Sequence, residues 1–254
     1  MSAYLLYPGC SWESSARAYA LSTEAVCREL GLELRSLEDW NCCGATEYMS
    51  VDTVPAYALI SRNLALAARQ GNGATTLTAP CSLCYLNLSK ADHYLSENPA
   101  LNKKVNRALD AGGLRYQPGS LEVRHLLDIL LNDVGLETIR QHVTHPLSGL
   151  RVAPYLGCLL ARPDYHGRFS SPDQPRELDR LLTTLGAQVV DYPMRTQCCG
   201  GHMTQIGPET AYELLRRLLY GAEQYDAHLI ATVCPMCQLN LDAYQHDVNR
   251  HFGT

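Results

Sequence analysis

The chain has 254 residues, of which 21 are Lys or Arg and 26 are Asp or Glu, and 46% are hydrophobic. This length is enough for one large domain or two modest ones, each with its own hydrophobic core. The formal net charge of −5 and the absence of a run of basic residues argue against a nucleic-acid-binding protein. No apolar stretch reaches the roughly 18 residues that a transmembrane helix requires, so we expect no direct membrane insertion.

The amino terminus gives an expectation about the cellular compartment. It has no basic start, and Pro8 and Gly9 come before any apolar stretch long enough for a signal peptide. A chain without an export signal stays where thiols are kept reduced. We therefore expect a cytoplasmic protein whose 11 cysteines are thiols or metal ligands.

The first part of the chain alternates between strand and helix patterns. A short apolar strand is predicted over 3–7, and a helix follows around 15–30, with Gly31 suited to its C-terminal cap. Residues 32–37 alternate between apolar and charged types, which predicts a second strand. The β-prone residues 75–78 predict a third.

The middle of the chain differs from what precedes and follows it. Turn-forming residues lead into a predicted amphipathic helix over 120–132, whose leucines are expected to pack in a core rather than to dock a partner. The segment 145–149 contains Pro and Gly and interrupts the pattern. We place the domain boundary here, with a first domain and its helical connector over 1–147 and a second domain over 148–254.

The last part of the chain repeats the order of the first. Strands are predicted over 152–156, 188–192 and 229–233, with a helix over 175–186 and another that starts near Pro208. Strands that alternate with helices predict mostly parallel sheets. The predicted fold class is α/β, with two tandem related domains. Each is a small, mostly parallel sheet flanked by helices, and the two are related by a pseudo-twofold axis.

Ten of the cysteines form two copies of one pattern, C-x31-C-C-x37-C-x2-C and C-x39-C-C-x34-C-x2-C. The first copy consists of Cys10, Cys42, Cys43, Cys81 and Cys84, and the second of Cys158, Cys198, Cys199, Cys234 and Cys237. Neighbouring residues repeat as well, because each copy begins Tyr-x-Gly-Cys and ends Cys-x-x-Cys-x-Leu-Asn-Leu. Five matched thiols do not recur by chance, so the sequence predicts a duplicated thiolate site.

Three kinds of site could account for these thiols. Disulfides are disfavoured because Cα atoms of adjacent residues lie about 3.8 Å apart, below the roughly 4.4 Å lower limit for a disulfide. Zinc is disfavoured because a closed structural site takes four ligands, whereas each copy offers five. Soft thiolates select iron–sulfur clusters, and a cubane cluster takes four of them. Five thiolates therefore indicate a cubane with a spare thiol or a cluster of another shape, and the spacing does not decide between the two.

The predicted location of the cysteines supports a ligand site. All ten follow predicted strand ends, on loops that open helices, which is where open α/β sheets bind ligands. Helix N-termini also stabilise thiolates.

Two further residues lie outside the repeated set. Cys27 has no counterpart in the second copy and is expected to be buried in its helix. His202 is expected either to donate a hydrogen bond to cluster sulfur or a proton to a leaving thiolate, or to be a capping or partly exposed histidine.

The two patterns resemble the cysteine-rich CCG domains of the B-type subunit of heterodisulfide reductase, from Tyr4 to about Leu241. Related domains occur in subunits of some quinone-linked dehydrogenases. The resemblance implies two noncubane 4Fe-4S clusters. It assigns the first to Cys10, Cys42, Cys43, Cys81 and Cys84, and the second to Cys158, Cys198, Cys199, Cys234 and Cys237.

The resemblance also implies a function. It predicts the catalytic iron–sulfur subunit of a heterodisulfide-reductase-like complex, an oxidoreductase that cleaves or forms a disulfide, with the ten cluster ligands as its catalytic residues. The implied partners are a subunit with ferredoxin-like cubane clusters, a flavoprotein subunit, and a disulfide or thiol substrate that can be protein-bound. The alternative is a non-catalytic electron-transfer subunit that links a flavin dehydrogenase to a quinone or another acceptor.

Overall fold

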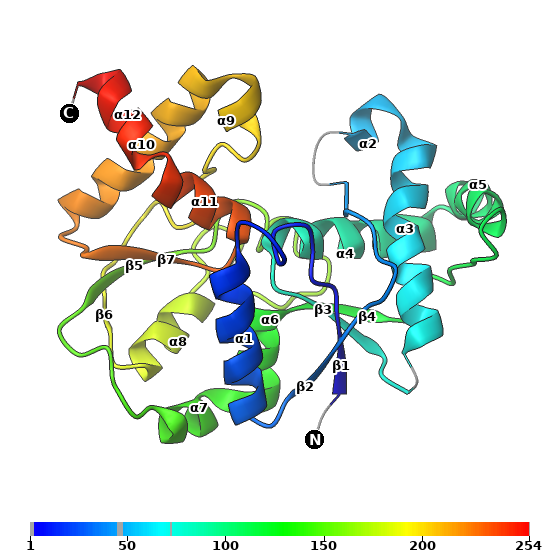
Figure 1. Cartoon of the computed structure of the whole chain (residues 1–254), viewed down its shortest axis with the longest axis horizontal. Helices are drawn as coiled ribbons and strands as arrows, with labels where there is room; N and C mark the ends of the chain where they lie inside the picture. The colour runs from blue at the N-terminus through cyan, green and yellow to red at the C-terminus, as the bar shows by residue number, and fades with distance from the viewer. Residues whose placement is uncertain (1–2, 45–47, 72, 254) are drawn as a thin grey trace. The chain divides into compact units, whose positions relative to one another are not determined.

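A computed structural model of the chain describes residues 3–44, 48–71 and 73–253. The chain divides into two compact units, Met1–Leu126 and Leu127–Thr254, each built around a parallel sheet with flanking helices (Figure 1). The predicted α/β fold class with parallel sheets is confirmed. The domain boundary after residue 147 stays a prediction.

The sheet of the first unit has the strand order β2-β1-β3-β4, and every neighbouring pair is parallel. Its strands are β1 (Ala3–Leu6), β2 (Glu33–Ser36), β3 (Thr76–Ala79) and β4 (Glu122–His125). In the register of the sheet, Leu5 lies opposite Leu77, and Leu77 lies opposite Val123. All three are buried, as expected of parallel strands that helices cover.

The helices of this unit supply the rest of its core. They are α1 (Arg17–Glu29), α2 (Tyr48–Val51), α3 (Thr53–Gln70), α4 (Ser82–Glu97) and α5 (Pro99–Asp110). The apolar face of α3 buries Ile60, Leu64 and Leu66 completely. Helix α5 begins where the Asn98 side chain accepts a hydrogen bond from the Leu101 N–H at 3.0 Å, which satisfies one of the free amides of its first turn.

The prediction of an amphipathic helix over 120–132 is wrong for the first part of this range. Residues 122–125 form β4, and helix begins only with α6 (Leu126–Ile129), which continues through a π-helix (Leu130–Gly135) into α7 (Leu136–His142). The Glu122 N–H donates to the Thr75 carbonyl at 2.8 Å, at the start of the β3–β4 pairing. This long-range pairing decides the conformation against the local leucine pattern.

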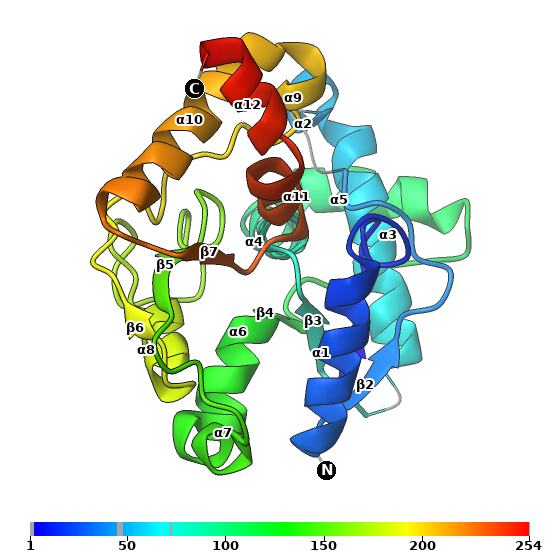
Figure 2. The ribbon, with the colours of Figure 1, turned by 60° about the vertical axis from the view of Figure 1, so that its left-hand side comes forward.

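The sheet of the second unit has three strands in the order β6-β5-β7, again parallel. They are β5 (Arg151–Tyr155), β6 (Gln188–Val189) and β7 (Leu229–Thr232). The helices are α8 (Glu177–Thr184), α9 (Met203–Ile206), α10 (Pro208–Gln224), α11 (Pro235–Ala243) and α12 (Gln245–Phe252). Helices α10 and α11 lie on one side of β5 and β7, and α8 lies on the other (Figures 1 and 2).

A pair of equivalent positions tests how differently the two sheets are covered. Leu77 and Ile230 each lie four residues before the first cysteine of a C-x2-C motif, but Leu77 is fully buried and Ile230 is half-buried. We expect Leu77→Ala to lower the free energy of unfolding by about 2–5 kcal/mol and Ile230→Ala by about half as much or less. Urea unfolding followed by circular dichroism measures both, and equal losses would contradict the difference in burial.

Candidate metal centres

The first unit brings one set of five cysteines to the carboxyl end of its sheet. Cys10 follows β1, and the adjacent Cys42 and Cys43 follow β2. Cys81 is the residue before α4, and Cys84 lies in the first turn of that helix. These five residues are called the first thiol site below.

The second unit repeats the arrangement. Cys158 follows β5, the adjacent Cys198 and Cys199 follow β6, and Cys234 immediately precedes α11, with Cys237 in the first turn. These five residues are called the second thiol site. As the sequence predicted, the cysteines lie on segments that leave strand ends and lead into helices, where ligands of parallel α/β sheets bind.

The thiols of the first site are in mutual contact. The Sγ atoms of Cys43 and Cys84 lie 3.5 Å apart, and hydrogen bonds join Cys10 to Cys42, Cys42 to Cys43, and Cys81 to Cys84. The hydrogen bond with Cys42, together with burial and the neighbouring charge, raises the pKa of Cys10. The same partner is the main cause that raises the pKa of Cys43 to about 12.

Most contacts of the first site recur in the second, where backbone N–H groups also donate to the adjacent cysteines. The Sγ atoms of Cys199 and Cys237 lie 3.4 Å apart, and Cys158 is hydrogen-bonded to Cys198. That bond, aided by the Gly200 N–H at 3.3 Å from the Cys198 sulfur, lowers the pKa of Cys198 to about 6. The hydrogen bond with Cys198 raises the pKa of Cys158, as expected when neighbouring thiols share their protons.

Each site has an open end and a closed end. In the first site Cys10 and Cys42 are exposed, whereas Cys43 and Cys84 are buried. In the second site Cys158 and Cys198 are half-buried, and the Cys199 and Cys237 thiols lie deeper. A ligand held by the closed end of a site would therefore be reachable from the open end.

In each unit a buried asparagine is hydrogen-bonded to the backbone of the adjacent cysteines. The Asn87 side-chain N–H donates to the Cys43 carbonyl at 3.0 Å, and Asn240 donates to the Cys199 carbonyl at 3.1 Å and to the Gly201 carbonyl at 2.8 Å. The asparagine amide nitrogen also lies 3.8 Å from the Cys43 sulfur in the first unit and 3.6 Å from the Cys199 sulfur in the second. Sequence reasoning gave these asparagines no role, although the repeated Cys-x-x-Cys-x-Leu-Asn-Leu motif contains both.

A buried tyrosine ties each strand end to the loop that carries the adjacent cysteines. The Tyr7 hydroxyl donates to the Asn41 carbonyl at 2.7 Å, and the Tyr155 hydroxyl donates to the Gln197 carbonyl at 2.7 Å. Burial, followed by the charges of nearby cysteines, raises the pKa of both tyrosines. The two hydroxyls therefore remain donors and fix the carbonyl just before each cysteine pair.

A glycine precedes the first cysteine of each site because the sulfur of another cysteine lies against it. Gly9 and Gly157 have φ angles of +76° and +75°. A Cβ atom there would lie 3.1 Å from the Cys84 sulfur and 3.2 Å from the Cys237 sulfur, respectively. The positive φ and the close approach both require glycine.

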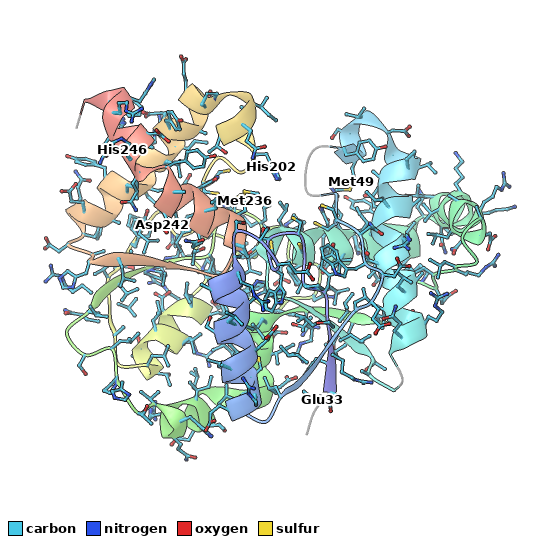
Figure 3. All side chains as sticks on the ribbon, in the orientation of Figure 1. Glu33, Met49, His202, Met236, Asp242 and His246 are labelled. Carbon is cyan, nitrogen blue, oxygen red and sulfur yellow. The ribbon has the colours of Figure 1, made fainter. Side chains whose placement is uncertain are left out.

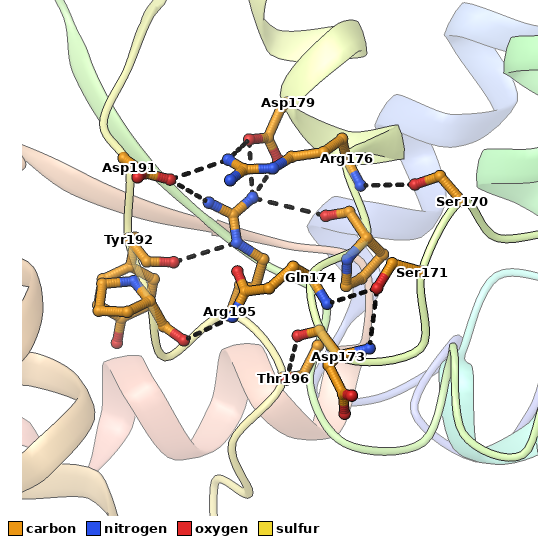
Figure 4. Close-up of polar contacts among 12 residues, drawn as sticks. Ser170, Ser171, Asp173, Gln174, Arg176, Asp179, Asp191, Tyr192, Arg195 and Thr196 are labelled. Carbon is orange, nitrogen blue, oxygen red and sulfur yellow. Dashed lines mark hydrogen bonds and ion pairs between the residues drawn. The ribbon is translucent and has the colours of Figure 1, made fainter.

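The cysteine loop of the second unit is held by a buried arginine that sequence reasoning missed (Figure 4). The Arg195 side chain is fully buried and donates to both carboxylate oxygens of Asp179 at 2.7 and 2.6 Å. It also donates to Asp191 at 3.2 Å and to the Tyr192 carbonyl at 3.1 Å. One guanidinium nitrogen bonds both oxygens of Asp179, and the other two bond Asp191 and the Tyr192 carbonyl, so these separate partners give the guanidinium a fixed orientation.

The backbone of Arg195 reaches the other side of the second thiol site. Its carbonyl accepts the N–H groups of Leu156 at 2.9 Å and Gly157 at 3.0 Å, immediately before Cys158. Arg195 therefore joins the segment that leads to Cys198 with the segment that leads to Cys158. In the first unit the cysteine loop is held instead by Asn63, whose amide bonds the N–H and carbonyl of Asn41 at 2.9 and 3.0 Å.

The two residues outside the repeated cysteine set lie apart from these contacts. Cys27 is buried in α1, as predicted, and burial raises its pKa to about 11. His202 directly precedes α9 and makes no side-chain capping hydrogen bond, but it is half-buried, in agreement with the predicted alternative of a partly exposed histidine. His202 is labelled in Figure 3.

The donor set of each site suits a multinuclear cluster better than a single ion. Within the described parts of the chain, no three His, Cys, Asp or Glu side chains are grouped so that they could hold one metal ion. Each site instead offers five soft sulfur donors, several of them in pairwise contact. Soft thiolates select iron–sulfur clusters, and iron would stabilise the thiolate forms of Cys10 and Cys43, which hydrogen bonds with Cys42 and burial disfavour. The residues of each thiol site therefore fit an iron–sulfur cluster.

Comparison with known proteins assigns the family. A model of the cysteine-rich domain named CCG matches residues 4–89 and 152–242. This chain belongs to the CCG family, with two copies of the cysteine-rich domain. The resemblance inferred from the sequence is thereby confirmed.

Three curated relatives extend over nearly the whole chain. The 8-methylmenaquinol:fumarate reductase membrane anchor subunit of Wolinella succinogenes is 34% identical over 97% of this chain and 84% of its own length. A protein of Archaeoglobus profundus that resembles the B-type subunit of heterodisulfide reductase is 33% identical over 98% and 84%. The B-type subunit of the ferredoxin/F(420)H(2)-dependent CoB-CoM heterodisulfide reductase of Methanosarcina acetivorans is 30% identical over 100% and 84%.

One solved structure shares the fold of this CCG protein. A hypothetical protein from Helicobacter pylori superimposes with a TM-score of 0.73 at 15% identity, over 98% of this chain and 44% of that chain. Although one relative is named a membrane anchor subunit, no helix in the described residues of this chain has the length and apolar character to cross a membrane.

Replacement of Arg195 tests its role as the anchor of the second thiol site. Arg195→Met would leave the mostly buried Asp179 carboxylate with Arg176 as its remaining partner, and we expect it to lower the free energy of unfolding by about 1–3 kcal/mol. Arg195→Lys keeps the charge without the planar fork, so its loss should be smaller. Chemical denaturation measures both, and an Arg195→Met protein as stable as the unmodified chain would contradict the anchoring role.

Proposed function

We propose that this CCG protein is the catalytic iron–sulfur subunit of a heterodisulfide-reductase-like complex. It acts on a sulfur group, cleaving or forming a disulfide, and exchanges electrons with partner subunits. The observation that carries the proposal is the open end of each thiol site, where Cys10 and Cys42 are exposed and Cys158 and Cys198 are half-buried. Two of the relatives are named for the B-type subunit of heterodisulfide reductase, and they align with essentially the whole chain.

The proposed ligands are the five cysteines of each thiol site. We assign one noncubane 4Fe-4S cluster to Cys10, Cys42, Cys43, Cys81 and Cys84, and another to Cys158, Cys198, Cys199, Cys234 and Cys237. When bound, such a cluster supplies one-electron redox chemistry and iron with affinity for sulfur. Five thiolates exceed the four that a cubane requires, and we take the noncubane form from the resemblance to the B-type subunit.

The residues of the chain position this chemistry. Asn87 and Asn240 hold the backbone of the adjacent cysteines, and each directs an amide N–H toward a cysteine sulfur. Hydrogen bonds to cluster sulfur and burial are two of the means by which proteins set cluster potentials. The buried ends of the sites exclude water, while the open ends admit the sulfur of a substrate.

The overall reaction is balanced by two electrons and two protons. A disulfide R–S–S–R′ accepts both electrons, its S–S bond breaks, and each sulfur takes up one proton to give RSH and R′SH. The reverse reaction oxidises two thiols and returns the electrons. The chain has no Gly-x-Gly-x-x-Gly motif after its first strand and no phosphate-binding loop. The electrons therefore come from partners, which we propose to be a subunit with ferredoxin-like cubane clusters and a flavoprotein, in the cytoplasm.

A second candidate function is favoured by the fumarate reductase relative. That protein is named a membrane anchor subunit of an 8-methylmenaquinol:fumarate reductase and is 34% identical to this chain. By analogy, this protein would carry electrons between a flavin dehydrogenase and a quinone without acting on a disulfide. The two functions differ in whether an added disulfide accepts electrons at the thiol sites.

The test is disulfide-dependent oxidation of reduced benzyl viologen by the anaerobically purified protein. Coenzyme M–coenzyme B disulfide and lipoamide serve as substrates, and a soluble naphthoquinone is the competing acceptor. We expect oxidation with at least one disulfide. The variants Cys10→Ser and Cys158→Ser should lower its rate by about tenfold or more, equivalent to about 1.4 kcal/mol.

The matched control is Cys27→Ala, because Cys27 is buried in α1 and takes no part in the thiol contacts, so this change should leave the rate unchanged. Naphthoquinone reduction without any disulfide reduction would overturn the catalytic proposal in favour of electron transfer.

A further inference from the structure

The two sheets differ at one edge. In the first unit β3 lies inside the sheet, with β1 on one side and β4 on the other. In the second unit the equivalent strand β7 pairs with β5 and is an edge strand of the sheet. Each strand leads directly into the C-x2-C motif of its site, so the correspondence between the two strands is residue by residue.

The two strands also differ in burial, as expected of an inner strand and an edge strand. Leu77, Thr78 and Ala79 in β3 are completely buried. Their equivalents Ile230, Ala231 and Thr232 are only half-buried, and Leu229, at the start of β7, is 41% exposed. An edge strand of this kind offers unpaired backbone groups to another chain.

A cavity of about 410 Å³ borders β7. Its lining comes from α10, β7 and α11, and it includes Leu219, Leu229, Ile230, Gln238 and Leu241. The lining therefore contains exposed residues of β7 and apolar residues of two helices. The edge of β7 and the cavity next to it are treated as one surface. We call it the β7 groove.

In the first unit, the position beside β3 that corresponds to the β7 groove is occupied by β4. There β4 runs parallel to β3, with Leu77 opposite Val123 and Ala79 opposite His125. The ring of His125 contacts that of Tyr85 edge-on, with 5.9 Å between centroids. Tyr85 directly follows Cys84, so the carboxyl end of β4 lies against the first turn of α4, which carries Cys84.

The same helix position in the second unit is uncovered. Gln238 corresponds to Tyr85, since each directly follows the second cysteine of its C-x2-C motif. Tyr85 is buried, whereas Gln238 is exposed and lines the β7 groove. A strand added to β7 would therefore end beside Cys237 and the second thiol site, as β4 ends beside Cys84.

The charge of the groove restricts its occupant. Its lining includes the acidic, exposed Glu223 and Asp242 together with His228, and it includes neither lysine nor arginine. Asp242 is labelled on α11 in Figure 3. A segment that combines apolar residues with lysine or arginine would complement both the apolar lining and the two carboxylates.

We infer that the β7 groove docks an extended, basic segment of a partner protein, which adds a parallel fourth strand to the sheet beside the second thiol site. Main-chain hydrogen bonds along an open edge supply affinity in this mode of recognition, and side-chain pockets supply specificity. A four-residue strand spans about 13 Å, the length of β7. The inference does not depend on the clusters, since it rests on the edge of β7 and its surroundings.

The test uses the anaerobically purified full chain and a fluorescein-labelled peptide with the sequence of residues 119–127, which includes β4, carrying Glu122→Lys so that the peptide is basic. Binding is followed by fluorescence anisotropy, and hydrogen exchange locates the protected amides. We expect saturable binding with protection at 229–232. The double variant Glu223→Lys with Asp242→Lys should weaken binding by about tenfold or more, because both replacements repel the basic peptide.

Two controls establish whether the peptide binds as a strand in the groove. Glu209→Lys makes a matched charge change at the exposed start of α10, outside the groove, and should leave binding unchanged. A peptide with Val123→Pro should not bind, because proline cannot complete a strand ladder.

Absence of binding, or protection at 76–79 instead of 229–232, would overturn the inference. A concentration-dependent dimer that Leu229→Glu abolishes would show a second copy of this chain in the groove and would also overturn it. Iron content is measured on the same samples. Because peptide binding does not require the clusters, a low iron content would count against the proposed function and not against this inference.

Discussion

Five sulfur atoms held in contact within one small site are the constraint on which each unit depends. Neighbouring thiols share protons: hydrogen bonding with Cys42 raises the pKa of Cys10, and hydrogen bonding with Cys158, aided by a donor N–H, lowers the pKa of Cys198. A bound metal would favour the thiolate form of all five. The glycines, tyrosines and asparagines around the sites act on the backbone, so that the sulfur atoms stay close together whether or not they are ionised.

The duplication preserved this backbone scaffold and changed what lies outside it. Tyr7, Gly9 and Asn87 have counterparts with the same contacts in the second unit. The anchors of the cysteine loops are different, because Asn63 serves in one unit and Arg195 in the other. The sheets also differ, since β4 covers β3 while β7 is left at an edge. These differences make the two thiol sites alike in ligands and unlike in surroundings.

The sequence predicted features that depend on short-range or repeated patterns. The parallel strands, the cysteines at their carboxyl ends and the burial of Cys27 are visible in spacing and periodicity. β4 was missed because its conformation depends on pairing with β3, which is more than forty residues earlier in the chain. Arg195 was missed because an arginine near acidic residues predicts a solvated surface, and only the folded loop buries it against Asp179. Asn87 and Asn240 were in the repeat, but their contacts with cysteine carbonyls require the fold.

The measurement that tests the account most directly is iron and acid-labile sulfide per chain, with EPR, on protein purified without oxygen. Two four-iron clusters require about eight iron and eight sulfide per chain, with EPR signals that respond to added thiol and differ from those of a simple cubane. Stoichiometric zinc without sulfide, persisting after anaerobic reconstitution with iron and sulfide, would contradict the proposal that the two thiol sites hold redox clusters.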